Sequence, residues 1–173
     1  DRLSGTYPIS ISGSAASIPA LGDVGNVTVS PLDGQILRYN GTNWVNANSA
    51  GRRVVSTYTA VGIQPDVATD VSIGTPKTYA LLKIEVSHAC WLTLYSDTAS
   101  RTADSTRLET TDPTPGSGVL SELITTGATS QAITPGTIAF NSSGSAITYA
   151  KIVNKSGAQV NLQVQLTFVP LEE

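Results

Sequence analysis

Apolar and polar residues alternate along much of the second half of this chain, and this pattern predicts β-strands. The clearest run is 160–168, where Val, Leu and Phe at even positions alternate with Asn, Gln and Thr. A strict period of two indicates a strand with one buried face and one face in water. Further strands are expected at 54–60, 67–73, 79–95, 119–125, 138–141 and 146–154.

The segment 79–95 has the strongest strand pattern, but it is long for a single strand. We therefore expect a turn or bulge near 87–89. Its even-numbered residues are mostly apolar and are expected to face the core. Tyr79, Trp91 and Tyr95 share the odd-numbered face. Such a face suits a sugar- or protein-binding platform, a second buried face of a sandwich, or a subunit interface, and we favour the interface.

Turn-forming residues separate these expected strands. A long loop rich in Ser, Thr, Asp and Pro covers 96–118, with a short helical turn expected at 99–104. The Thr-Pro-Gly-Thr sequence at 134–137 is a further expected turn. Strands at intervals of roughly 8–12 residues with turns between them predict an all-β fold, a jelly-roll-like β-sandwich, for residues 52–173.

Residues 1–51 are different, because their apolar residues are sparse and lie among Ser, Thr, Asn and Gly. Such a segment cannot fill a core of its own, so we expect an extended arm that orders with copies of itself or along another protein. Asn40-Gly41 predicts a β-hairpin within 33–47, and an isolated hairpin is marginal in water. The candidate residues for an oligomer or partner interface are Tyr7, Ile9, Ile11, Leu37, Tyr39 and Trp44.

The composition narrows the classes of partner. Charged residues make up 13% of the chain, against about 25% in an average globular protein. A net charge of −3 offers no positive surface for nucleic acid. No apolar run reaches the roughly 18 residues that span a bilayer, so membrane insertion is not expected. The neutral surface, rich in hydroxyl and amide groups, suits an extracellular protein or an assembly.

Few residues suggest catalysis or metal binding. His88 and Cys90 are the only histidine and the only cysteine, so no intrachain disulfide is possible. Both fall on the apolar face of 79–95, where a core role is favoured, because zinc needs about four ligands. With no G-x-S-x-G motif, we expect no enzyme activity, metal or cofactor. The absence of Met and the start at Asp1 indicate a fragment or a trimmed chain.

The 96–118 loop is the best candidate for contact with a receptor or partner, because loops of this length usually carry function. Its acids alternate with arginines. They could bind calcium or act as a carboxylate pair on a glycan, but the D-x-D-x-D-G spacing is absent and a solvated loop with local ion pairs is favoured. The candidate contact residues are Arg101, Asp104, Arg107 and Asp112.

Several segments carry recognisable motifs. Residues 5–15 read G-T-Y-x-I-x-I-x-G-x-A, and 21–45 contain L-x-D-V followed by D-G-Q-x-L-x-Y-N-G-x-x-W-V. Residues 101–104, 111–122 and 153–172 read R-x-A-D, T-D-P-x-P-G-x-G-V-x-x-E and V-N-x-S-G ending in L-x-F-x-P-L-E. These motifs resemble those of tailed-bacteriophage tail fibre and appendage proteins, notably of phages that infect cyanobacteria. The resemblance implies a homotrimeric virion protein and carries over no catalytic residues.

The sequence therefore predicts a phage tail fibre or related virion appendage, exposed on the virion surface. It would assemble with tail, baseplate or capsid proteins and attach to host surface polysaccharide through the avidity of several copies. A head decoration or cement protein, whose arm clamps the capsid, is an alternative. A glycan-degrading tail enzyme is a second alternative, which the short length disfavours. A bacterial surface or pilus module is a weaker third.

Overall fold

The computed structural model describes residues 27–28, 35–39, 41–48 and 51–172. The chain divides into two compact units, Asp1–Ser49 and Ala50–Glu173, close to the boundary expected between residues 51 and 52. Tyr7, Ile9 and Ile11, three of the candidate interface residues, lie outside the described residues.

The first unit contains a small sheet built around the predicted hairpin. Strands β2 (Gln35–Tyr39) and β3 (Trp44–Asn48) pair antiparallel, and β1 (Val27–Thr28) pairs parallel with β3. The connection needs Gly41, whose φ of 100° lies in the region that favours glycine. Tyr39 and Trp44 lie opposite each other across the two strands, with ring centroids 5.5 Å apart.

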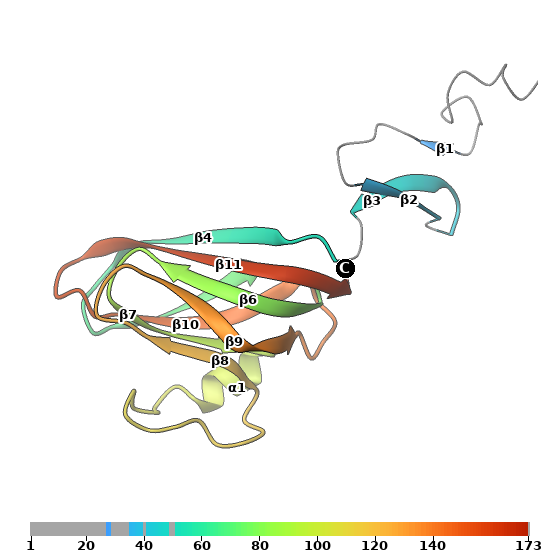
Figure 1. The fold of residues 1–173 in the computed structure, drawn as a ribbon. Helices are drawn as coiled ribbons and strands as arrows, with labels where there is room; N and C mark the ends of the chain where they lie inside the picture. The colour runs from blue at the N-terminus through green and yellow to red at the C-terminus, as the bar shows by residue number, and fades with distance from the viewer. Residues whose placement is uncertain (1–26, 29–34, 40, 49–50, 173) are drawn as a thin grey trace, which may run out of the picture. The chain divides into compact units, whose positions relative to one another are not determined.

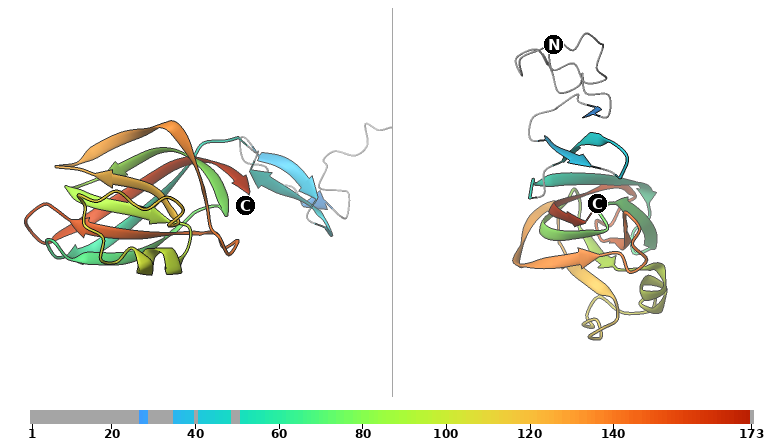
Figure 2. Two further views of the ribbon diagram at one scale, coloured as in Figure 1. Left: turned by 90° about the horizontal axis from the view of Figure 1, so that it is seen from below. Right: turned by 90° about the vertical axis from the view of Figure 1, so that its right-hand side faces the viewer.

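The second unit is an all-β sandwich of two four-stranded antiparallel sheets, with one short helix (Figures 1 and 2). One sheet has the order β4-β11-β6-β9 and the other has the order β5-β10-β7-β8. The strands are β4 (Val54–Ile63), β5 (Ala68–Gly74), β6 (Thr78–Val86), β7 (Cys90–Tyr95), β8 (Val119–Ile124), β9 (Thr129–Phe140), β10 (Ile147–Asn154) and β11 (Val160–Glu172). The helix α1 is Thr98–Ala103, where the sequence predicted a helical turn.

The strand pairing is nested, which gives the sandwich its jelly-roll topology. β7 pairs with β8, β6 with β9, β5 with β10 and β4 with β11, as in one long hairpin that has been rolled up. The rolling brings β6 beside β11 and β10 beside β7. The predicted jelly-roll-like sandwich is confirmed.

The core lies between the two sheets and follows the alternation seen in the sequence. On β11, Leu162, Val164 and Leu166 are fully buried, whereas Asn161 and Gln163 are exposed. Ile73 and Ile152 reach the same core from the second sheet. The period-two interpretation of 160–168 is therefore confirmed, except at Thr167, which was expected to face water and is 6% exposed.

Strand β6 departs from the predicted pattern. In its pairing with β11, Leu81 lies opposite Phe168 and Lys83 lies opposite Thr167, so Leu82 is an extra residue that changes which residues face inward. Tyr79 and Leu81 are buried before this extra residue, and Ile84 is buried after it. The prediction that the even-numbered residues face the core is thus wrong for Ala80, which points outward, because a bulge reverses the alternation.

Two predicted turns had different outcomes. The turn near 87–89 is present, and it places His88 half-buried in the turn and not on the core face that the pattern predicted. Cys90, at the start of β7, is fully buried, as expected for a small apolar residue. The turn predicted at 134–137 does not separate two strands, because these residues lie within β9, an edge strand on which a proline is tolerated. An interruption is nevertheless present there as a bulge, since Thr137 lies opposite Leu81 and Ala132 lies opposite Lys83, and the register with β6 skips 133–136.

Candidate functional site

The candidate site is the connection between β7 and β8, residues 96–118, which packs on the outer face of the β5-β10-β7-β8 sheet (Figure 1). We call it the 96–118 loop. β7 is an inner strand of this sheet, and its residues alternate between the core and the loop. Leu92 and Leu94 face the core. Trp91 and Tyr95 lie on the opposite face, where they donate hydrogen bonds to Glu122 and Asp104 and are buried beneath the loop.

This burial decides between the interpretations of the aromatic face. Tyr79 belongs to the sandwich core, where its hydroxyl lies 2.7 Å from the Thr148 hydroxyl and its ring centroid lies 4.9 Å from that of Phe168. Trp91 and Tyr95 are covered by residues of the same chain. The favoured subunit-interface interpretation of these three residues is wrong, and the second buried face is what the structure contains.

The base of the 96–118 loop is closed by hydrogen bonds at both ends. The Ser96 amide donates to the Gly118 carbonyl at 2.9 Å. Asp97 caps α1 by accepting from the Ser100 amide at 2.7 Å, and it also accepts from the Ser142 hydroxyl at 2.8 Å. The hydrogen bonds from Ser100 and Ser142 lower the pKa of Asp97 to about 2, so this cap is ionised at neutral pH.

Gly118 is required at the end of the loop. Its φ of 80° is one that other residues rarely adopt, and a Cβ atom at this position would overlap the side chain of Ser100. The chain can therefore close against α1 only with glycine here.

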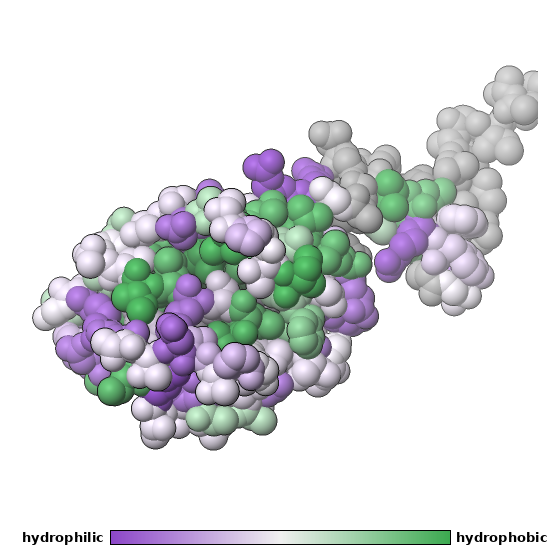
Figure 3. All heavy atoms as spheres, turned by 60° about the horizontal axis from the view of Figure 1, so that its bottom comes forward, coloured by the Kyte–Doolittle hydropathy of each residue, from purple (hydrophilic) through white to green (hydrophobic). Residues whose placement is uncertain are grey.

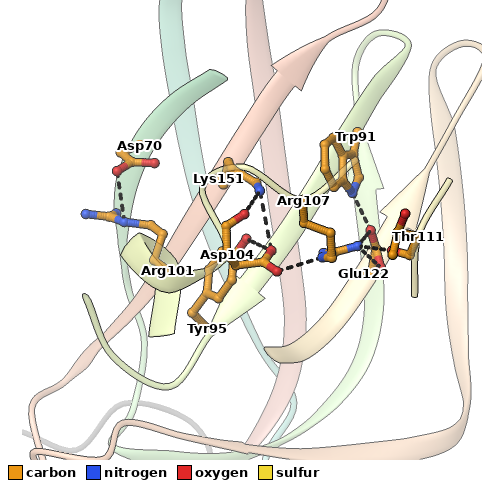
Figure 4. A network of polar contacts seen from close by, with 9 residues as sticks. All are labelled: Asp70, Trp91, Tyr95, Arg101, Asp104, Arg107, Thr111, Glu122 and Lys151. Carbon is orange, nitrogen blue, oxygen red and sulfur yellow. Dashed lines mark hydrogen bonds and ion pairs between the residues drawn. The ribbon is translucent and has the colours of Figure 1, made fainter. Parts of the chain in front are cut away.

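The centre of the loop is held by Asp104, whose side chain is 8% exposed (Figure 4). Its carboxylate accepts from the Tyr95 hydroxyl and from Arg107 Nε, each at 2.7 Å, and lies 3.4 Å from Lys151 Nζ. Burial alone would raise the pKa of Asp104, but the hydrogen bonds from Arg107 and Tyr95 and the charge of Lys151 lower it overall. Burial, together with the neighbouring Asp104 carboxylate, raises the pKa of the Tyr95 phenol, which stays a hydrogen-bond donor.

Arg107 joins Asp104 to strand β8. Its Nη1 atom donates to Glu122 at 2.9 Å and to the Thr111 carbonyl at 2.8 Å, and Glu122 also accepts from the Trp91 indole. The guanidinium lies 5.1 Å from the centre of the Trp91 ring, and Lys151 Nζ lies 4.5 Å from it. Hydrogen bonding to Asp104 raises the pKa of Arg107, so the cation persists although it is buried.

A second contact fixes α1 to the sheet. Arg101 Nε lies 3.1 Å from Asp70 on β5, and Arg101 Nη1 donates to the Val71 carbonyl at 2.9 Å. Its guanidinium also lies over the ring of Tyr149 on β10, 5.5 Å from the centroid. α1 is thus attached to β5, which comes well before it in the sequence, and to β10, which comes well after it.

The four predicted loop contacts therefore lie in two environments. Arg101, Asp104 and Arg107 form hydrogen bonds with other residues of the same chain and so order the loop, whereas Asp112 is exposed. Leu108, which the sequence did not single out, is 67% exposed. Contact of this loop with a receptor or partner remains a prediction, and the side chains available for it are those of the outer surface.

Sequence reasoning missed the partners of the loop. Lys151 is 3% exposed and donates to the Asp104 carbonyl at 2.8 Å, and Glu122 receives Arg107. The available signal was a lysine inside the otherwise apolar strand 146–154. A cation there needs a buried partner, since a lysine is rarely fully buried unless it is paired.

In the first unit, the predicted interface residues of the hairpin carry exposed apolar surface. Tyr39 is 51% exposed and Trp44 is 41% exposed, whereas Leu37 is half-buried. The neighbouring Ile36 is 46% exposed. Nothing within the described residues of this unit covers these side chains fully.

The described part of the chain has neither a metal-binding cluster nor a membrane-spanning helix. It holds no group of three or more His, Cys, Asp or Glu side chains placed to bind a metal ion. None of its helices has the length and apolar character needed to cross a membrane. No family model matches this sequence, and no curated protein is similar to it.

Proposed function

We propose that this chain is a structural protein of a tailed-bacteriophage virion, a component of a tail fibre or similar appendage that assembles as a homotrimer. The observation that carries the proposal is the set of large apolar side chains exposed on both units of a chain with a neutral surface. Clustered exposed apolar groups commonly mark surfaces that contact other proteins. The resemblance of five sequence segments to phage fibre proteins supplies the class of assembly.

On the sandwich, the apolar group lies at one end of the β4-β11-β6-β9 sheet. Ile138 on β9 is 55% exposed and lies opposite Ala80 on β6, which in turn lies opposite Val169 on β11. Phe140, also on the edge strand β9, and Leu171, also on the inner strand β11, are 47% and 57% exposed nearby. We call these five residues the apolar end. Figure 3 shows apolar residues gathered over part of the domain surface among polar ones.

The apolar end is also where the chain enters the sandwich. Val55, near the start of β4, is 54% exposed and pairs with Thr167, two residues before Val169. In the other unit, the hairpin residues Tyr39 and Trp44 carry exposed apolar surface of their own. A homotrimer would therefore bury apolar groups from both units of each chain.

The polar network suits a structural role. Asp104 and Glu122, the acids in the centre of the site, are engaged by Arg107, Tyr95 and Trp91. These contacts fix a long loop that presents its outer residues in one arrangement, which lowers the entropy lost when a partner binds. The proposal assigns the chain a place on the virion exterior, binding to other virion proteins and attachment to host surface polysaccharide. It includes no role in catalysis, nucleic-acid binding or membrane insertion.

The test is the mass of the full chain in solution, measured by light scattering. We expect a trimer of 17.9-kDa chains. A double substitution, Ile138→Ser with Phe140→Ser, is expected to reduce the trimer. Val61→Ser is the matched control, because Val61 is 76% exposed at the opposite end of the sheet.

A monomeric wild-type chain would contradict the homotrimer and would favour the decoration or cement alternative. The place on the virion is tested separately, by immunogold labelling of particles of the virus that encodes the chain. Labelling of the capsid surface instead of the tail would contradict the appendage assignment.

A further inference from the structure

A surface cavity of about 390 Å³ lies at the other end of the β4-β11-β6-β9 sheet. It includes Glu85 and Ser87 from the end of β6, Ser130 from β9, and Gln163 and Gln165 from β11. Its volume falls in the range of about 300–1,000 Å³ that small-molecule sites occupy. We call it the polar groove.

The strand register places the polar groups in two rows. Ser130, Glu85 and Gln165 lie directly opposite one another on three neighbouring strands. In the next row, Gln163 and Ser87 are joined because the backbone N–H of Gln163 donates to the Ser87 hydroxyl at 2.8 Å. Directly opposed side chains have Cβ atoms about 4.5–5.5 Å apart, so the groups of a row can contact the same ligand.

In the groove, internal contacts hold Glu85, whereas the two glutamine side chains make only a long contact with each other. Glu85 binds Lys83 Nζ at 2.7 Å, and the hydrogen bonds from Lys83 and Ser130 lower the pKa of Glu85. The Gln165 amide lies 3.5 Å from the Gln163 carbonyl oxygen, which is a long contact. Both glutamine side chains can therefore turn toward a ligand without losing a strong internal hydrogen bond.

These groups select a ligand by its chemistry. Two primary amides, hydroxyls and one carboxylate provide both donors and acceptors, which match the neighbouring hydroxyls of a sugar. A phosphate or other polyanion is disfavoured, because the groove contains a carboxylate and the adjacent Lys83 is already paired with it. An apolar ligand is disfavoured, because Val86 and Ala128 are the only apolar residues among those that line the groove.

We propose that the polar groove binds a neutral saccharide chain. The inference rests on the proposed function only for the source of the sugar, which would be a polysaccharide on the host surface. Each groove is polar and open, so binding at one site is weak, and several copies on one assembly would supply useful avidity.

The test uses the full chain on a printed array of neutral oligosaccharides, namely glucans, mannans, galactans and N-acetylhexosamine chains. We expect binding to at least one of these classes. Gln165→Ala and Glu85→Ala should each weaken that binding by about three- to tenfold, the usual effect of losing one hydrogen-bonding partner in an open site. Gln64→Ala is the control, because Gln64 is exposed and lies outside the groove.

Absence of binding to every neutral class would overturn the inference, and so would binding that both variants retain. Should one substitution impair folding, the other still tests the groove. The trimer mass is measured on the same samples. A trimer that binds none of the sugars would refute saccharide binding by the groove and leave the proposed homotrimer intact. A monomer that binds a sugar would refute the homotrimer and support the groove.

Discussion

Replacing Asp104 with Asn tests whether the buried network orders the 96–118 loop. The substitution keeps the shape of the side chain and removes its charge, so Arg107 and Lys151 lose their shared anion. Their side chains are 8% and 3% exposed, so water cannot readily replace the lost partner. Breaking a buried ion pair by removing one member costs about 3–5 kcal/mol.

The expected loss is somewhat smaller here. Lys151 keeps its hydrogen bond to the Asp104 carbonyl at 2.8 Å, and Arg107 keeps Glu122 at 2.9 Å. We therefore expect Asp104→Asn to lower the free energy of unfolding by about 2–4 kcal/mol. At about 2–4 °C per kcal/mol for a chain of this length, the melting temperature should fall by roughly 5–15 °C.

The assay combines urea unfolding, followed by circular dichroism, with hydrogen exchange of the 98–118 amides. Asp112→Asn is the matched control, because it removes the same charge from an exposed position in the same loop. The control should change the unfolding free energy by no more than about 0.5 kcal/mol. If the two variants behave alike, and loop amides exchange at the same rate in both, the network does not hold the loop.

Three further predictions concern the 96–118 loop and the core of the sandwich. Gly118→Ala should destabilise the chain by about 1–3 kcal/mol in urea unfolding, because φ is positive there and a Cβ atom would overlap Ser100. Gly116→Ala is the control and should cost less, because Gly116 also has a positive φ but a Cβ atom there would meet no neighbouring atom. The folded-state pKa values of Asp97 and Asp104 are lowered, so the stability that these carboxylates contribute is present above about pH 4 and should be lost as the pH falls toward 2. In acid unfolding curves, Asp97→Asn should therefore make the free energy of unfolding depend less steeply on pH over this range. Burial raises the pKa of the Cys90 thiol, so a thiol reagent at pH 8 should label it only as fast as the chain unfolds, and rapid labelling of the native chain would contradict its buried position.

The strands that sequence could predict are those whose environment follows a local rule. β11 has one face in the core and one in water, so its period of two is visible in the residues themselves. β7 has its core on one side and the 96–118 loop on the other, and all six of its residues are buried. No local pattern distinguishes a face covered by a loop from a face covered by another subunit, which is why the aromatic residues were misassigned.

The network could not be predicted, because its members are distant in sequence. Asp104 and Lys151 meet only because β10 lies beside β7 in the rolled sandwich. An acid followed by an arginine three positions later is typical of a solvated loop, and the sequence of 104–107 has that appearance. The bulge that turns Ala80 outward is likewise a property of the pairing between β6 and β11 and not of either strand alone.

The two ends of the β4-β11-β6-β9 sheet differ in a way that connects both proposals. Outward-facing residues at the apolar end include Ile138 and Ala80, whereas those at the polar groove include Ser130 and Glu85, on the same two strands. One sheet face therefore offers apolar surface where the chain enters and hydrogen-bonding groups at the opposite end. If copies assemble through the apolar end, the grooves stay uncovered and identical sites remain available together. That combination is what attachment by avidity requires.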